Sequence, residues 1–314
     1  MCPPSAYGKH ELKYAKHNLS YEFSQKKGLE HILSYANLRA DFMKKINNEN
    51  LISNITKDYP FIDKSVIGTS RLGVPIYAFI IGHGAKDIMI NASHHANEWI
   101  TTLLLFNFLE EKASKYNKEI DLWNEIKLHC IPLVNPDGVN MVLGKKVSND
   151  WKANACGVDL NKNYPANWYQ AKSYYFQQGF CKPGAKNFVG ERPLSEPETS
   201  AMAAYTFLND FLTTLSLHTQ GEEIYYKYLD FNPKGANELA KKFAEVSGYK
   251  LEEVPEESSF AGYRDWFITE FNRPGFTIEC GLGENPLPLS DFSYMYKKTS
   301  PILEEALKWT AKQA

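Results

Sequence analysis

The sequence predicts a single α/β domain, with a mixed, largely parallel twisted sheet flanked by helices. Two observations lead to this fold class. From about residue 51 onward, short apolar runs alternate with segments of helical periodicity. Several of these runs are apolar throughout, as expected for strands that helices cover on both faces. The chain has 314 residues, of which 43% are apolar, and no repeat, low-complexity block or Gly/Ser linker divides it.

The first 50 residues differ from the rest. The segment GLEHILSYANLRADFMKKI (28–46) carries apolar residues at helical spacing, among them Leu29, Ile32 and Leu33. We therefore expect residues 1–50 to form a partly helical N-terminal extension, and residues 51–314 to form the main domain.

The expected strands are runs of apolar and β-branched residues bounded by turn residues. A hairpin around SRLGVP (70–75) and the apolar run DIMINA (87–92) come first. In full, the expected strands are 65–68 and 76–81, which form the hairpin, and 87–92, 126–134, 212–218 and 275–280.

Four helices are expected between and after these strands. They run from Ile100 to about Tyr116, from Ser195 onward, from Pro233 to about Ser247, and from about Ser300 to Lys312. The second has a specific start signal, because Ser195 and Glu198 have the spacing of a capping box.

Charge and apolar content limit the partners. There are 35 basic and 37 acidic residues, a formal charge of −2, so we expect no nucleic-acid partner. No window approaches the roughly 18 to 20 apolar residues that cross a bilayer, and the start lacks the apolar core of a signal peptide. We expect no membrane partner and a cytoplasmic location for the chain as given; a missing leader would instead allow extracellular action.

The five cysteines include no CxxC pair, which argues against a structural zinc knot or a dense disulfide scaffold. A single bridge, such as one between Cys156 and Cys181, stays open.

Three polar clusters follow three of the expected strands. They are SHHANE (93–98), HTQGEE (218–223) and the glutamate of FTIECG (276–281). In open α/β sheets, sites gather at the carboxyl ends of the strands, so we expect one shared site. His95, Glu98 and His218 could hold a metal there, since catalytic zinc takes three such ligands and leaves one position for water. His94 could replace His95, and each histidine could instead be structural.

The order of the motifs adds a family resemblance. The passages HHANEWITT, LVNPDGV, DWKANACGVDLNKNYP, SLHTQGE and FTIECG resemble the successive motifs of the zinc carboxypeptidase family, of carboxypeptidase A type, over roughly residues 55–312. The passages HTQGEEIYY, GVDLNKNYPANW and FVGERPLSEPE resemble more narrowly the bacterial γ-D-glutamyl-(L)-diamino acid peptidases, which cut peptidoglycan stem peptides.

This resemblance implies a role for each matching residue. His95, Glu98 and His218 would hold one Zn²⁺, and Glu279 would be the general base, although alone it could be a buried salt-bridge partner. Lys152 stands where the family has an arginine that stabilises the oxyanion. Asn161 and Lys162 match the Asn-Arg pair that binds a substrate's terminal carboxylate, so the fork of a guanidinium is missing.

By the same resemblance, Arg264 would lie at the floor of the pocket for the residue after the cut, counting back from Asp265 and Trp266. An arginine there favours a side chain that ends in a carboxylate, as in meso-diaminopimelate. Alternatively, Arg264 points away into a salt bridge. No tyrosine lies in PEESS (255–259), where the family has its substrate-capping tyrosine, and Tyr263 comes too late to match.

We therefore expect a zinc peptidase that cuts the γ-D-glutamyl to meso-diaminopimelate bond of peptidoglycan stem peptides or muropeptides. Its action at the cell wall would require a missing leader. One alternative is a metallocarboxypeptidase that removes C-terminal residues from ordinary peptides. A non-catalytic module that binds stem peptides is another.

Overall fold

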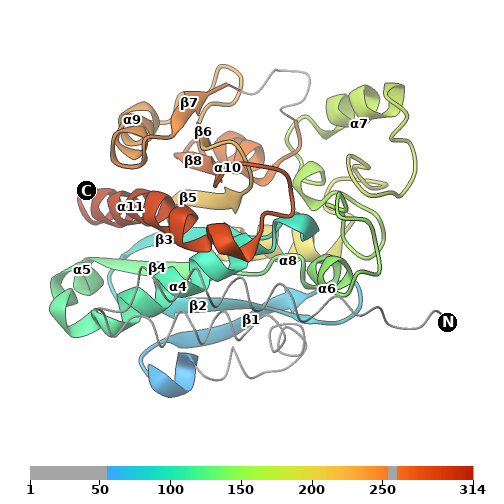
Figure 1. Cartoon of the computed structure of the whole chain (residues 1–314). Coiled ribbons are helices and arrows are strands. Elements are labelled where there is room, and N and C mark those ends of the chain that lie inside the picture. The colour runs from blue at the N-terminus through green and yellow to red at the C-terminus, as the bar shows by residue number, and fades with distance from the viewer. Residues whose placement is uncertain (1–54, 254–259, 314) are drawn as a thin grey trace. The chain divides into compact units, whose positions relative to one another are not determined.

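The computed structural model describes residues 55–253 and 260–313. These residues form one α/β domain, in which helices cover both faces of an eight-stranded sheet (Figure 1). The predicted N-terminal extension, 1–50, lies outside the described residues. Within the described part, no helix is both long and apolar enough to span a bilayer.

The strands alternate with helices as the sequence predicts. The strands are β1 (Asp63–Thr69), β2 (Pro75–Ile81), β3 (Lys86–Ala92), β4 (Ile126–Ile131), β5 (Phe211–His218), β6 (Glu223–Tyr225), β7 (Lys250–Glu252) and β8 (Gly275–Glu279). The α-helices are α4 (Ile100–Ser114), α5 (Ile120–Glu125), α6 (Pro136–Leu143), α7 (Trp168–Gln177), α8 (Pro197–Leu208), α9 (Ala236–Ser247), α10 (Tyr263–Phe271) and α11 (Phe292–Ala311). Short 3₁₀ turns are η1 (Ala96–Glu98), η2 (Tyr116–Lys118), η3 (Leu160–Lys162) and η5 (Leu289–Asp291).

The sheet is mixed and largely parallel, as predicted. Its strand order is β1-β2-β4-β3-β5-β8-β6-β7. The central strands β4, β3, β5 and β8 run parallel to one another, whereas β1 and β2 form the predicted antiparallel hairpin. The carboxyl ends of β3, β5 and β8 therefore lie side by side at one edge of the sheet.

Strand β2 illustrates how the sheet is buried on both faces. Its side chains alternate in direction, as in any strand. Ile76 and Ala78 belong to the same core as Met202 of α8 and Trp266 of α10. Phe79 instead packs edge-on against Phe106 of α4, with ring centroids 5.5 Å apart. Figure 1 shows α4 and α11 crossing the near face, with α8 behind the sheet.

The predicted capping box at the start of α8 is wrong. Glu196 is the N-cap residue and Pro197 occupies the first turn, where a missing N–H costs nothing. The Ser195 hydroxyl donates to the Glu196 carboxylate. The Glu198 carboxylate accepts a hydrogen bond of 2.9 Å from the backbone N–H of Arg71, far away in the chain. The Glu198 side chain thus binds a distant segment instead of completing a local capping box.

Three other helix and strand boundaries differ from the predicted ones. The last helix begins at Phe292 rather than near Ser300 and contains Pro301, which helix propensity disfavours in an interior. Helix α9 begins at Ala236 rather than Pro233, because Gly235 (φ 84°) precedes it in a left-handed conformation. The strand expected over 126–134 ends at Ile131.

Helices α5, α6, α7 and α10 were not expected, and α10 shows one reason. Its residues from Tyr263 to Ile268 are all buried. A helix that is buried all round has no polar face, so it lacks the amphipathic period from which helices are recognised.

Candidate metal and catalytic site

The structure brings the three polar clusters together. His95 and Glu98 follow β3, with Glu98 at the end of η1, whereas His218 and Glu279 are the last residues of β5 and β8. Because β3, β5 and β8 are neighbouring parallel strands, residues far apart in the sequence meet at one edge of the sheet.

A strained turn carries the chain from β3 to His95. Ser93 has φ 54°, a left-handed conformation that a residue with a side chain rarely adopts. Its hydroxyl is 2.9 Å from the Thr101 hydroxyl and 2.8 Å from that of Thr102, on the first turn of α4. These buried contacts hold the turn against its conformational cost.

Asn135 connects this turn to the segment that bears Lys152. Its side-chain oxygen caps α6 by accepting from the backbone N–H of Gly138, at 3.0 Å. Its amide nitrogen donates to the carbonyls of His94 at 3.1 Å and Ala153 at 3.2 Å. One residue of the motif LVNPDGV thus sets the relative position of two parts of the site.

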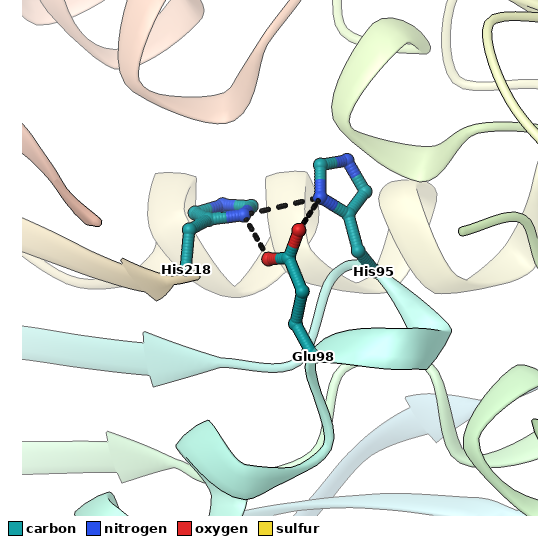
Figure 2. A group of neighbouring side chains, drawn as sticks. All are labelled: His95, Glu98 and His218. Carbon is teal, nitrogen blue, oxygen red and sulfur yellow. Dashed lines mark hydrogen bonds and ion pairs between the residues drawn. The ribbon is translucent and has the colours of Figure 1, made fainter. Parts of the chain in front are cut away.

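His95, Glu98 and His218 form a compact, buried cluster (Figure 2). Each imidazole presents Nδ1 to one carboxylate oxygen: His95 Nδ1 is 2.8 Å from Glu98 Oε1, and His218 Nδ1 is 2.8 Å from Glu98 Oε2. The two Nδ1 atoms are 3.3 Å apart, and one ligand atom from each of the three residues lies within 4.8 Å of the others.

Asp159 orients the His95 ring. Its Oδ1 lies 3.2 Å from His95 Nε2. Burial would raise the pKa of Asp159, but the neighbouring His95 lowers it well below its ordinary value, so the group is a carboxylate and accepts the Nε2 proton. His95 Nδ1 is therefore the ring nitrogen that faces the cluster.

These donors fit zinc. Two imidazoles and one carboxylate are a common catalytic zinc set, and a carboxylate behind a ligating histidine is its usual support. Asp159 was not predicted from the sequence, although it lies in the motif GVDLNKN, two residues before Asn161.

His94 does not belong to this cluster. Its Nε2 lies 3.0 Å from the hydroxyl of Tyr164, away from Glu98. Burial lowers the pKa of His94 well below its ordinary value, so the ring is neutral. Of the two adjacent histidines, His95 is therefore the candidate ligand.

Lys152 places a positive charge beside the cluster. Its ammonium lies 3.2 Å from Glu98 Oε1. Burial would raise the pKa of Glu98, but His95 and Lys152 outweigh this effect and hold it well below its ordinary value. Burial would lower the pKa of Lys152, but the carboxylates of Glu98 and Asp159 raise it, so Lys152 remains charged.

Glu279 has the opposite tendency. Burial and, after it, the negative charge of Glu98 raise its pKa to about 8. Two nearby carboxylates with pKa values pushed apart can serve different roles, one as a ligand and one in proton transfer.

A cavity of about 470 Å³ opens over the cluster. Six of the eight predicted site residues line it, whereas Glu98 and His218 lie in the cluster at its base. The six are His95, Lys152, Asn161, Lys162, Arg264 and Glu279. The other lining residues were not predicted as site residues, namely Asp159, Tyr175, Lys186, Asn187, Tyr225, Gly262, Asp265 and Thr277.

Arg264 combines the two alternatives considered for it. Its Nε donates to Asp265 Oδ1 at 2.9 Å, which is the salt bridge. The side chain nevertheless lines the cavity, and its guanidinium carbon lies 5.8 Å from the centroid of the Tyr225 ring. A cation thus stands in the pocket, held by a carboxylate and an aromatic ring.

The carboxylate-binding candidates also lie in the cavity. Asn161 Oδ1 accepts from the backbone N–H of Tyr263 at 3.0 Å, next to Arg264. The Lys162 ammonium lies 5.2 Å from the centroid of the Tyr175 ring. The hydroxyl of Tyr263 contacts Thr206, so this tyrosine does not take the capping role.

Two further expectations concern the surroundings. The segment PEESS, where the family has its capping tyrosine, falls in 254–259, outside the described residues. Cys156 and Cys181 are both exposed free thiols.

A metal ion held beside a carboxylate and a lysine can polarise an amide carbonyl while the carboxylate moves a proton to its nitrogen. That chemistry defines a metallopeptidase. Residues 48–306 match the model of the family described as zinc carboxypeptidase, and the chain belongs to this family. It is a zinc metallopeptidase that acts on peptides.

Two relatives match most of the chain. It is 38% identical to gamma-D-glutamyl-L-diamino acid endopeptidase 1 of Lysinibacillus sphaericus over 275 residues, 79% of this chain and 68% of the relative. It is 40% identical to the uncharacterized protein YqgT of Bacillus subtilis (strain 168) over 290 residues, 82% of this chain and 75% of the relative.

The fold is also similar to solved structures. The crystal structure of thrombin activatable fibrinolysis inhibitor aligns with a TM-score of 0.71 over 84% of this chain and 73% of that one. The sequence identity is 22%, so this likeness concerns the fold alone.

Proposed function

We propose that this peptidase hydrolyses the amide bond between γ-D-glutamate and a diamino acid, meso-diaminopimelate above all, in peptidoglycan stem peptides or muropeptides. The observation that carries the proposal is the position of Arg264 in the cavity that Glu279 also lines. The side chain of diaminopimelate ends in a carboxylate and an ammonium group. A guanidinium binds such a carboxylate through charge-assisted hydrogen bonds.

Each residue of the site has a part in this reaction. Zn²⁺, held by His95, Glu98 and His218, supplies a Lewis acid and lowers the pKa of water when it is bound. Glu279 accepts a proton from the attacking water and delivers it to the leaving nitrogen of the diamino acid. The Lys152 ammonium stabilises the negative charge that develops on the carbonyl oxygen.

Similarity to a relative supports the same substrate class. The Lysinibacillus sphaericus protein is named as a γ-D-glutamyl-L-diamino acid endopeptidase, and it matches most of this chain. The presence of Lys162 in place of an arginine supports it further, because a lysine is a point charge without the fork that grips a terminal carboxylate. The site is therefore less suited to an enzyme that strictly removes C-terminal residues from ordinary peptides.

Product analysis tests the proposal directly. The zinc-loaded protein is incubated with L-Ala-γ-D-Glu-meso-diaminopimelate and with a set of ordinary peptides, and the products are identified by mass spectrometry. We expect release of the diamino acid from the first substrate. Turnover of the ordinary peptides alone would favour a metallocarboxypeptidase, and tight binding of the tripeptide without turnover would favour a binding module.

A further inference from the structure

The cavity is lined by a further lysine, Lys186, to which neither the motifs nor the proposed chemistry assigns a role. Its side chain is 44% exposed, and its ammonium lies 3.7 Å from the carboxylate of Asp150, which is 60% exposed. A long ion pair between exposed groups contributes little, so it opposes the binding of another anion only weakly.

The position of Lys186 is nevertheless set by the catalytic segment. The carbonyl of the preceding residue, Ala185, accepts hydrogen bonds from the backbone N–H groups of Lys152 at 2.7 Å and Ala153 at 3.0 Å. The backbone N–H of the following residue, Asn187, donates to Asp159 Oδ2 at 3.1 Å. Asp159 in turn contacts His95, so the backbone at Lys186 is fixed relative to the metal ligands.

The charges in the cavity differ in how they are held. Lys152 contacts Glu98, and Arg264 contacts Asp265, both through buried carboxylates. The carboxylate partner of Lys186, Asp150, is instead exposed to solvent. A substrate anion in the cavity can therefore take the place of Asp150 without leaving a buried carboxylate unpaired.

We propose that Lys186 binds a substrate carboxylate next to the scissile amide and thereby favours acidic γ-glutamyl substrates. This inference rests on the proposed function. Two carboxylates of such a substrate flank that amide: the α-carboxylate of the γ-linked glutamate, and the carboxylate on the diamino acid carbon that bears the leaving nitrogen. Their chemistry is the same, so amidation of each in turn distinguishes them.

The experiment compares four full-length, zinc-loaded proteins: the wild type, Lys186→Ala, Lys186→Arg and Lys182→Ala. Lys182 is an exposed lysine of the same loop that does not line the cavity, so it is the matched control. The substrates are L-Ala-γ-D-Glu-meso-diaminopimelate, its glutamate α-amide, and its amide at the diamino acid carboxylate next to the scissile bond. Melting temperatures verify that all four proteins fold.

For Lys186→Ala we expect kcat/KM on the parent tripeptide to fall about 10- to 100-fold, as for loss of a hydrogen bond between charged groups, mainly through KM. Lys186→Arg should restore most of it, and Lys182→Ala should match the wild type. On one of the two amides, Lys186→Ala and the wild type should be equal, and that amide identifies the bound carboxylate.

An unchanged kcat/KM for Lys186→Ala on the parent, or an equal loss on all three substrates, would overturn the assignment of Lys186 while leaving the proposed function intact. If the wild type cleaves none of the three, the proposed function itself fails, and the role of Lys186 fails with it.

Discussion

His218 and Glu279 are direct register partners on the neighbouring parallel strands β5 and β8, and each is the last residue of its strand. Register partners on adjacent strands project to the same side of a sheet. The backbone ladder therefore fixes a metal ligand and the proposed general base relative to each other. A slip of one residue between β5 and β8 would turn one of them to the opposite face.

Glu279→Gln should abolish most of the activity without loss of metal. The amide cannot accept a proton, so we expect kcat to fall by about 10²- to 10⁴-fold. Zinc content per protein should stay that of the wild type, because Glu279 is not part of the ligand cluster. Glu270→Gln, at an exposed position of α10, is the control. A substantial residual rate would remove the general-base role.

His218→Ala should lose the metal. One imidazole and one carboxylate remain, which is too few for a catalytic zinc site. Elemental analysis after dialysis should find about one zinc per wild-type protein and little in the variant. His83→Ala changes an exposed histidine and should bind zinc normally. Full occupancy of the His218→Ala protein would contradict the proposed ligand set.

Asp159→Asn tests the support of His95. An amide can still occupy the space, but it no longer offers a charged acceptor to His95 Nε2. We expect metal affinity to fall about 10- to 100-fold, as when other partners of ligating histidines are changed. Competition with a chelator of known affinity measures this change. Equal affinity of variant and wild type would show that Asp159 has only a structural role.

The raised pKa of Glu279 predicts a pH dependence for the metal-free protein. Its ordinary value is 4.5, and burial raises it to about 8. Between these values the folded protein binds the extra proton, so the stabilising contribution is complete below 4.5 and is lost as the pH rises through 8. The melting temperature of Glu279→Gln minus that of the wild type should therefore increase from pH 5 to pH 9, by roughly 2–4 °C for each kcal/mol.

This comparison cancels the titrating groups that do not interact with Glu279, since both proteins contain them. A difference in melting temperature that stays constant, or that decreases with pH, would mean that Glu279 is ionised in the metal-free protein throughout this range.

Arg264→Ala should alter substrate selectivity. We expect kcat/KM for the diaminopimelate tripeptide to fall about 10- to 100-fold more than for the same peptide with lysine, because only the first loses a charge-assisted bond. The ratio of the two is the readout, since any general effect of unpairing Asp265 acts on both. An equal loss on both substrates would rule out Arg264 as the specificity residue.

Much of the fold could be predicted because its signals are local. Buried strands such as β3 and β5 appear as continuous apolar runs, and the hairpin of β1 and β2 surrounds its own turn residues. Helix α10, by contrast, escaped prediction. It is buried over most of its length, so it lacks the amphipathic pattern from which helices are recognised.

The residues of the candidate site also differ in whether local sequence signals reveal them. His95, Glu98, His218 and Glu279 were identifiable from strand-end clusters and ordered motifs. Lys186 could not be identified in this way, because it lies in a loop without a motif. Backbone hydrogen bonds of its neighbours to other segments place it at the cavity.

The sequence by itself determined the fold class, the family resemblance and the kinds of side chain available for chemistry, since these depend on residue type and local order. Only the tertiary structure showed that His94 instead contacts Tyr164, that Asp159 supports His95, and that Arg264 lines the cavity while paired with Asp265. Such choices depend on the direction of a side chain and on partners distant in the chain, which spacing along the sequence does not encode.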